Sequence, residues 1–60
     1  MCEVNVYVEK EGEEVLVLKD VDFIKPMGDQ ILLRDIMGDE KILKNRIKLI
    51  SFHDHKIILE

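Results

Sequence analysis

The sequence predicts an all-β protein, a small antiparallel β-barrel, and three observations support this. Six Val and eight Ile residues favour strands, because a branched Cβ restricts χ1 and suits a pleated surface. Ala, the best helix former, is absent. Turn residues recur roughly every 8 to 12 residues and separate about five or six short strands, which is typical of a small barrel rather than an open sheet.

The first two strands follow from the order of apolar residues. Polar and apolar side chains alternate from Cys2 to Glu9, and this period of two places Cys2 on the buried face with Val4, Val6 and Val8. Glu11-Gly12 predicts a turn, and a second strand is expected over residues 13–19. Its run from Val15 to Leu18 is apolar on both faces, so we expect the core to cover one face and a partner subunit the other.

The middle of the chain predicts shorter elements. Residues 20–22 are expected to form a turn or short connection, followed by a short strand from Phe23 that ends near Pro26, which has no N–H to donate. Gly28-Asp29 predicts the next turn, residues 30–36 the next strand, and Gly38-Asp39 a further turn.

The last third predicts a long strand with a break. Over residues 40–52 the apolar residues change parity between Leu49 and Ile50, which indicates a bulge or a barrel corner. A turn at residues 54–55 then leads into a final strand at 57–59. Phe23 and Phe52 are both expected in the core, and the whole fold is expected to be an SH3-like barrel forming one domain, residues 1–60.

Composition and charge exclude several classes of protein. Thirteen acidic residues against nine basic ones give a formal net charge of -4, which argues against a dedicated nucleic-acid binder. A hydrophobic content of 47% is too high for a disordered chain. No apolar run approaches the ~20 residues that a membrane span needs. One cysteine excludes an intramolecular disulfide, as expected of a reducing compartment, so we expect a soluble cytoplasmic protein.

The length of the chain predicts a homodimer. A domain of about 60 residues buries only about 60% of its unfolded surface and has a marginal core. Neither a disulfide framework nor a four-ligand zinc pattern is present to compensate. Self-association is the remaining common way for so small a domain to bury enough apolar area.

The sequence does not predict an enzyme. It contains no P-loop, GxGxxG, CxxC, HExxH or GxSxG motif. The only serine, Ser51, has no recognisable base and orienting group around it in the sequence. The many carboxylates fit a solvated acidic surface.

Cys2 is the strongest candidate for chemistry. Removal of Met1 would leave an α-amine and a thiolate on Cys2, and these two donors can close a chelate ring around a metal ion. If Met1 is retained, the deprotonated backbone amide of Cys2 could take the place of the amine. Thiolate with nitrogen suits late transition metals, and a square-planar set suits Ni(II) or Cu(II). One cysteine is too few for a closed site, but a two-fold dimer brings two copies together at its axis. The alternative is that Cys2 is a small buried hydrophobic residue.

Two other groups of residues are weaker candidates. His53 and His55 are two residues apart, so on a strand they would share a face and could bind metal, but they flank an expected turn and can equally be solvated. Lys44, Arg46 and Lys48 would form a basic stripe on one strand face, usable for single-stranded RNA. Pairing of these cations with acidic residues on neighbouring strands is the alternative.

Five segments of the chain resemble the CooT family, namely residues 1–8, 20–22, 38–41, 46–48 and 55–57. The resemblance covers essentially the whole chain. It implies a small homodimer that takes part in nickel delivery to carbon monoxide dehydrogenase. It also implies that Ni(II) is bound at the dimer interface through the cysteine directly after the initiator Met, which is Cys2 here. The His-rich tail of other nickel chaperones is absent, so metal storage is not implied.

Two further functions stay open from the sequence. One is an RNA-binding barrel that uses Lys44, Arg46 and Lys48, although the acidic charge makes nucleic acid an unfavourable partner. The other is a dimeric module in which Cys2 merely packs and a protein partner is recognised through a strand edge. The choice among Ni(II), Cu(II), Zn(II) and Co(II), and the recipient enzyme, are also open.

Overall fold

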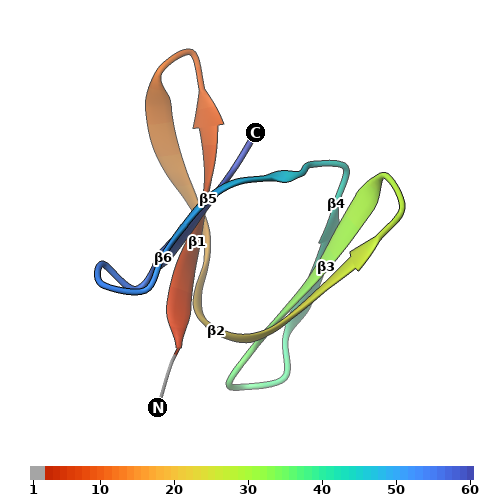
Figure 1. The fold of residues 1–60 in the computed structure, drawn as a ribbon. Helices are drawn as coiled ribbons and strands as arrows, with labels where there is room; N and C mark the ends of the chain where they lie inside the picture. The colour runs from red at the N-terminus through yellow and green to blue at the C-terminus, as the bar shows by residue number, and fades with distance from the viewer. Residues whose placement is uncertain (1–2) are drawn as a thin grey trace.

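A computed structural model describes residues 3–60, which form one six-stranded sheet (Figure 1). The strands are β1 (Val4–Lys10), β2 (Glu13–Met27), β3 (Gln30–Asp35), β4 (Glu40–Leu43), β5 (Ile47–Ser51) and β6 (Lys56–Leu59). Their order across the sheet is β4-β3-β2-β1-β6-β5. The expected all-β class is confirmed, and within residues 3–60 no helix is long and apolar enough to cross a membrane.

The predicted closed, antiparallel barrel is wrong in two respects. Within the described residues β4 and β5 are the two edges of the sheet and do not pair with each other. The neighbouring strands β1 and β6 are parallel, with Asn5 opposite Lys56 and Val8 opposite Leu59. The backbone of Arg46 exchanges two hydrogen bonds with Glu60, which aligns the start of β5 with β6 instead of with β4.

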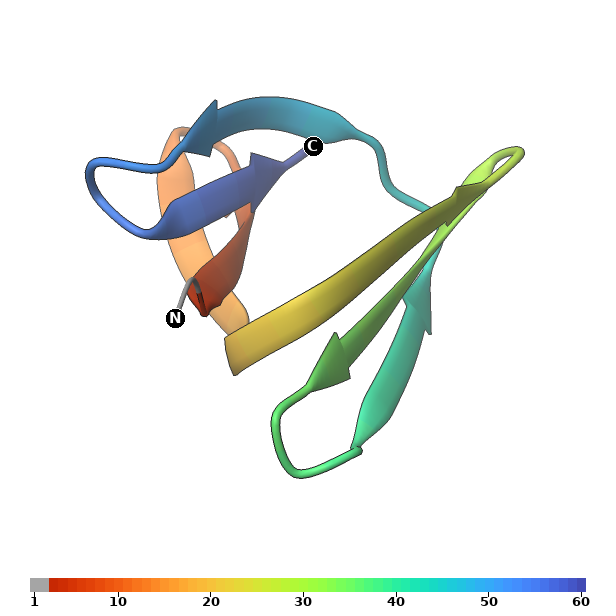
Figure 2. The same ribbon diagram turned by 60° about the horizontal axis from the view of Figure 1, so that its bottom comes forward.

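Residues 20–22, expected as a turn, are part of the long strand β2. Asp20 has a φ of 57°, and the register against β3 shifts between Val21 and Phe23, so the strand bends without reversing. The first part of β2 pairs with β1 and the second part with β3. Figure 2 shows the two parts, orange and then yellow, in the two halves of the molecule. The bend therefore lets one strand serve both halves.

The single long strand predicted over residues 40–52 is wrong, because the structure has two strands there, on opposite edges of the sheet, although the predicted irregularity is present in the second of them. Residues 44–46 separate β4 from β5, and a second irregularity shifts the register of β5 against β6 between Ile47 and Leu49. The alternation of apolar residues indicated an interruption at residue 49 or 50, whereas the larger interruption of the strand lies earlier, at residues 44–46.

The core lies between the two halves and is built mainly from β-branched residues. Val6, Leu33 and Leu59 are fully buried, and the alternation predicted for β1 is confirmed, since Val4 and Val8 are buried as well. The remaining members of the cluster are Val21, Ile31 and Ile57. Burial of each of these aliphatic side chains stabilises the folded state by about 1.5–3 kcal/mol, compared with leaving the side chain exposed to water. The expectation that both phenylalanines belong to the core is wrong, because Phe23 and Phe52 are exposed.

Candidate functional site

The strand that begins just after Cys2 is held firmly in the sheet. Cys2 itself lies outside the described residues, but Val4 is buried and pairs with Val21 of β2. On the other side, the backbone N–H of Asn5 donates a 2.9 Å hydrogen bond to the carbonyl of His55. Covalent geometry limits the distance between the Cα atoms of residues 2 and 4 to about 7 Å. Any metal bound by Cys2 therefore lies near the start of β1.

A cavity of about 210 Å³ opens at this end of the sheet. Its walls are mainly apolar: Val4, Val21, Ile24 and Ile57 with the two phenylalanines, Phe23 and Phe52. Aliphatic and aromatic walls offer no metal ligands. Across residues 3–60, His, Cys, Asp and Glu side chains nowhere gather in a group of three that could hold an ion.

Glu3, the residue after Cys2, carries an unsatisfied oxygen. Its Oε2 is enclosed and has no hydrogen-bond partner among the described residues. Most enclosed polar atoms are paired, because leaving one without a partner is costly. No sequence pattern points to this oxygen, because its enclosure depends on the fold.

The two histidines do not form the predicted pair on a strand face. His53 and His55 lie in the turn between β5 and β6, and both are exposed. His55 has a φ of 54°, and its carbonyl is used by Asn5. Ser51 closes the same turn, because its Oγ accepts from the Asp54 N–H at 3.2 Å and lies 3.1 Å from Asp54 Oδ2. The solvated-turn interpretation therefore holds for this segment.

The three cations do not form one stripe. Lys44 and Arg46 lie in the connection between β4 and β5, and only Lys48 lies in a strand. Arg46 Nε is 3.3 Å from Glu60 Oε2, and the Lys48 ammonium donates a hydrogen bond to the Glu9 carboxylate. That hydrogen bond raises the pKa of Lys48 above its ordinary value. Both cations pair with acidic residues, as the alternative expected, but only Lys48 does so between strands, from β5 to Glu9 on β1, whereas Arg46 and Glu60 lie outside the strands.

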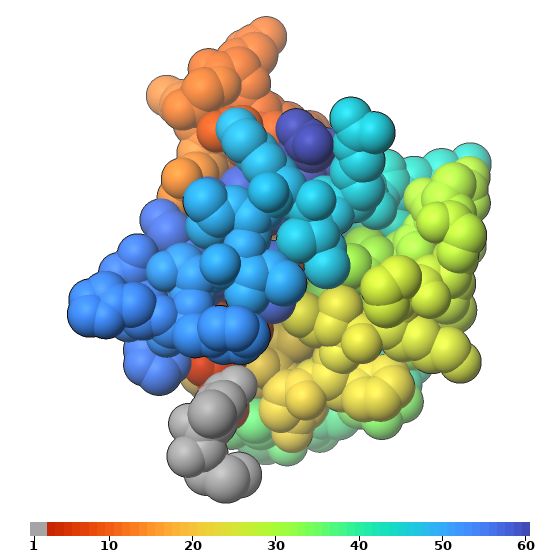
Figure 3. Space-filling model, viewed as in Figure 1, coloured from red at the N-terminus to blue at the C-terminus, as the bar shows by residue number. Residues whose placement is uncertain are grey.

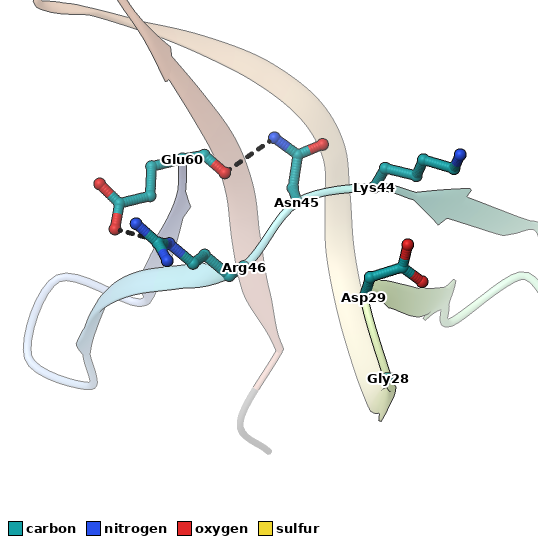
Figure 4. A pocket seen from close by; sticks show the side chains of 6 residues that line it. All are labelled: Gly28, Asp29, Lys44, Asn45, Arg46 and Glu60. Carbon is teal, nitrogen blue, oxygen red and sulfur yellow. Dashed lines mark hydrogen bonds and ion pairs between the residues drawn. The ribbon is translucent and has the colours of Figure 1, made fainter.

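A second cavity, which sequence reasoning missed, lies beside this connection (Figure 4). It measures about 580 Å³ and is lined by Gly28, Asp29, Lys44, Asn45, Arg46 and Glu60. Asn45 Nδ2 donates a 3.1 Å hydrogen bond to the backbone oxygen of Glu60. Two cations, Lys44 and Arg46, and two carboxylates, Asp29 and Glu60, line it, so the cavity favours neither anions nor cations. The lining residues are far apart along the chain, so no local pattern could have identified this cavity.

The outer face of the sheet carries its own apolar row, and charged groups border it. Leu16, Tyr7, Ile58 and Leu49 are register partners on four successive strands. Glu9 and Glu14 are register partners beside this row; Glu14 forms an ion pair with Lys56 at 3.2 Å, and Glu9 forms one with Lys48. Ile58 is buried here, whereas Val15 and Leu16 are half exposed. The predicted partner subunit that would cover residues 15 and 16 stays a prediction.

Comparison with known proteins gives a consistent result. The model of the family described as CO dehydrogenase accessory protein CooT matches residues 1–60. An uncharacterized protein of Methanocaldococcus jannaschii is 35% identical over 60 residues, which covers 100% of this chain and 98% of the relative. The crystal structure of a protein assigned as CooT from Carboxydothermus hydrogenoformans superposes with a TM-score of 0.92. It is 36% identical, and the match covers 98% of this chain and 95% of that one.

Proposed function

The chain belongs to the CooT family of CO dehydrogenase accessory proteins, and we propose that it is a nickel metallochaperone acting through Cys2 at a homodimer interface. The observation that carries the proposal is the family match over all 60 residues, which includes the Met1-Cys2 start. The delivered Ni(II) would serve maturation of CO dehydrogenase. The partners we propose are a second copy of the chain and CO dehydrogenase or its maturation proteins, in the cytoplasm.

The donor chemistry favours a site shared by two copies. A thiolate and one nitrogen from each Cys2 would supply four donors, the number that square-planar Ni(II) takes. The nitrogen is the α-amine if Met1 is removed, or the deprotonated amide of Cys2 if it is not. The region around Val4 is apolar, and residues 3–60 provide no group of three ligands to complete a site within one copy. Symmetry would provide the missing pair.

Such a site is suited to transfer rather than to permanent binding. Structural metal sites are closed by four protein ligands, whereas a site of few ligands near the start of the chain lets a recipient's ligands enter. The thiolate and the nitrogen must lose protons before they bind, so affinity falls at low pH and the ion is released more easily. The family is one of accessory proteins, which agrees with a non-catalytic role.

No structural observation favours RNA binding. The proposed stripe is interrupted, and two of its three cations are paired with carboxylates. Two of the three aromatic rings also carry a cation near their faces. The guanidinium of Arg34 lies 4.5 Å from the Phe23 ring centre, and Lys56 Nζ lies 6.0 Å from that of Tyr7. A single-strand binder would need both exposed rings and unpaired cations.

The deciding experiment is a nickel titration of the Cys2→Ser variant by calorimetry. We expect the wild type to bind one Ni(II) per dimer, and the variant to lose this binding while it remains folded and dimeric. His53→Ala is the matched control and should bind as the wild type does, because His53 lies in a solvated turn. Tight binding of one ion per dimer by Cys2→Ser would contradict the proposal.

A further inference from the structure

The turn between β3 and β4 presents two apolar side chains to solvent. Within this turn Met37 is 83% exposed and Ile36 is 51% exposed. Methionine and isoleucine are among the residue types that proteins most often bury. Figure 3 shows the atoms of the turn, in green, at the lower rim of the molecule, below the second half of β2 in yellow. The turn therefore has an apolar tip, Ile36 and Met37, that residues 3–60 leave uncovered.

Hydrogen bonds hold this turn in one conformation. The Asp35 carboxylate oxygen Oδ1 accepts from the backbone N–H groups of Met37 and Asp39, both at 2.9 Å. The Asp35 N–H donates to the Asp39 carbonyl at 2.9 Å, and the Gly38 N–H donates to the Asp35 carbonyl at 3.0 Å. The remaining N–H, that of residue 36, donates to a carbonyl of β2. All five N–H groups of the turn are bonded, so the apolar tip is already ordered and loses little conformational entropy when a partner covers it.

The turn lies beside the start of β1. Val4 pairs with Val21 of β2, and Val21 pairs in turn with Asp35. Paired Cα atoms are about 4.5–5.5 Å apart, so those of Val4 and Asp35 are no more than about 11 Å apart. Figure 1 shows the turn and the beginning of β1 at the same end of the molecule. Because Cys2 stays within about 7 Å of Val4, a partner bound at the apolar tip also reaches the proposed metal site.

Three aspartates border the apolar tip. Asp35 and Asp39 flank it in the turn, and the Asp20 carbonyl accepts the 2.9 Å hydrogen bond from the N–H of Ile36. The ion pairs found within residues 3–60 all use glutamates, so none of these aspartates is paired with a cation there. Like charges oppose the approach of a second copy, or of an anionic lipid surface, to this turn. The complementary surface is an apolar pocket with a rim of Lys and Arg on another protein.

We propose that the apolar tip is the docking element for the enzyme that receives the nickel, and that it enters an apolar pocket with a basic rim on that enzyme. The inference rests on the proposed function, because it identifies where the recipient binds. Docking here holds the recipient's own ligands close to the start of β1, which raises their effective concentration at the metal. A contact centred on two side chains suits a transient complex, which must separate after the ion is transferred.

The test is the affinity of this protein for the CO dehydrogenase of the same organism prepared without nickel, measured by interferometry with and without nickel on the accessory protein. We expect Met37→Asp to weaken binding about 30-fold or more, as for a central interface residue. Urea unfolding checks that this variant is folded, as its exposed position implies. Ile42→Asp is the matched control. Ile42 is 57% exposed on β4, outside the turn, and its substitution should leave the affinity unchanged.

A second variant tests the contribution of charge. Asp39→Asn removes one carboxylate and keeps the turn, because the hydrogen bonds of Asp39 within the turn use its backbone atoms. It should weaken binding to CO dehydrogenase at low ionic strength and have little effect at high ionic strength, where salt screens the charge. Tighter binding by Asp39→Asn would contradict a basic rim on the recipient.

The outcomes distinguish this inference from the function on which it rests. Met37→Asp should bind nickel as the wild type does, because Met37 supplies none of the proposed ligands. A wild type without measurable affinity for CO dehydrogenase, an unchanged affinity in Met37→Asp, or an equal loss in Ile42→Asp overturns the docking element alone. A changed oligomeric state of Met37→Asp on sedimentation also overturns it, because the turn then contacts a second copy. Binding that depends on Met37 in a protein that takes up no nickel overturns the nickel function and leaves the docking element.

Discussion

The side chain of Asn5 is bonded to the backbone of Asp20, fifteen residues away in the chain. Asn5 Oδ1 accepts a 3.1 Å hydrogen bond from the Asp20 N–H in a partly buried position. The carbonyl of Asp20 in turn accepts a 2.9 Å hydrogen bond from the N–H of Ile36. Asp20 is the residue at which β2 bends from β1 towards β3. One amide side chain therefore fixes the bend that joins the two halves.

Substitution of Asn5 by Ala should destabilise the protein. The Asp20 N–H would lose its partner in a partly buried position, at a cost of about 1–3 kcal/mol. Urea unfolding at a fixed protein concentration measures the change. Asn45→Ala is the control, because the Asn45 side chain makes an exposed hydrogen bond and its loss should cost less than about 0.5 kcal/mol. Equal effects of the two substitutions would contradict the role given to Asn5.

Replacement of Asp20 by Gly should stabilise the protein slightly. Asp20 has a φ of 57°, a conformation that costs about 1–2 kcal/mol for most residues and less for Asp, whereas glycine adopts it freely. We expect a gain of no more than about 1 kcal/mol, reduced by the greater flexibility of glycine when unfolded. Lys19→Gly, one position earlier in the extended part of β2, should be destabilising by about 0.5–1 kcal/mol. A loss of stability in Asp20→Gly would show that the bend tolerates the aspartate without strain.

The ion pair of Lys48 with Glu9 should give a pH dependence at alkaline pH. The hydrogen bond to Glu9 raises the pKa of Lys48 above 10.5, so the folded protein holds this proton more tightly than the unfolded chain. The stabilisation is fully present below pH 10.5 and is lost as the pH rises through the folded pKa. The difference in Tm between the wild type and Lys48→Met should therefore shrink above pH 10.5. Because the pair is exposed, the effect should be small.

Proximity of the two Cys2 thiols can be tested without metal. If the thiols face each other in the dimer, the oxidant diamide should join them in an intermolecular disulfide, with diamide reduced to its hydrazine. Bridged cysteines have Cα atoms about 4.4–6.8 Å apart, so bridging without rearrangement reports close approach. We expect a band of double mass on non-reducing gels for the wild type and none for Cys2→Ser. Failure of the wild type to cross-link faster than an unfolded control would argue against the shared site.

Nickel affinity should fall as the pH is lowered. Each thiolate and each nitrogen must lose a proton before it binds the ion, and an ordinary thiol has a pKa of about 8.5. We therefore expect apparent affinity to decrease at least tenfold between about pH 8 and pH 7, where two thiols each compete with protons. Titrations at the two pH values measure the change. An unchanged affinity would indicate donors that are already deprotonated.

Strands and turns that depend only on residues close to them in the chain could be predicted from the sequence. The alternation in β1 placed Val4, Val6 and Val8 in the core because the period of two reflects burial on one face only. The turn at Glu11-Gly12 could be predicted because glycine takes a positive φ freely, and in the structure both residues have a positive φ. In each of these cases the cause lies within a few residues of its effect.

Features that depend on contacts between residues far apart in the chain could not be predicted. Asp20 resembles a turn residue, and only the exchange of partners by β2 makes it a bend within a strand. Phe52 is aromatic but lies in a turn beyond the core, where a local pattern says nothing of its exposure. Arg46 leaves the predicted stripe because it pairs with Glu60, fourteen residues later. The position of Cys2 relative to a second copy depends on contacts between chains and has no local signature at all.

The parallel pairing of β1 with β6 has a consequence for how the chain assembles. The earliest strand to leave the ribosome pairs along one side with residues 56–59, the latest of the six to be made. Contacts that link such distant parts of a chain slow folding, because a large loop must close before they form. Ile57 and Leu59 belong to the core, so a nascent chain that stops short of them leaves Val4, Val6 and Val8 uncovered. Translation pauses late in synthesis would thus hold an aggregation-prone strand without its neighbour.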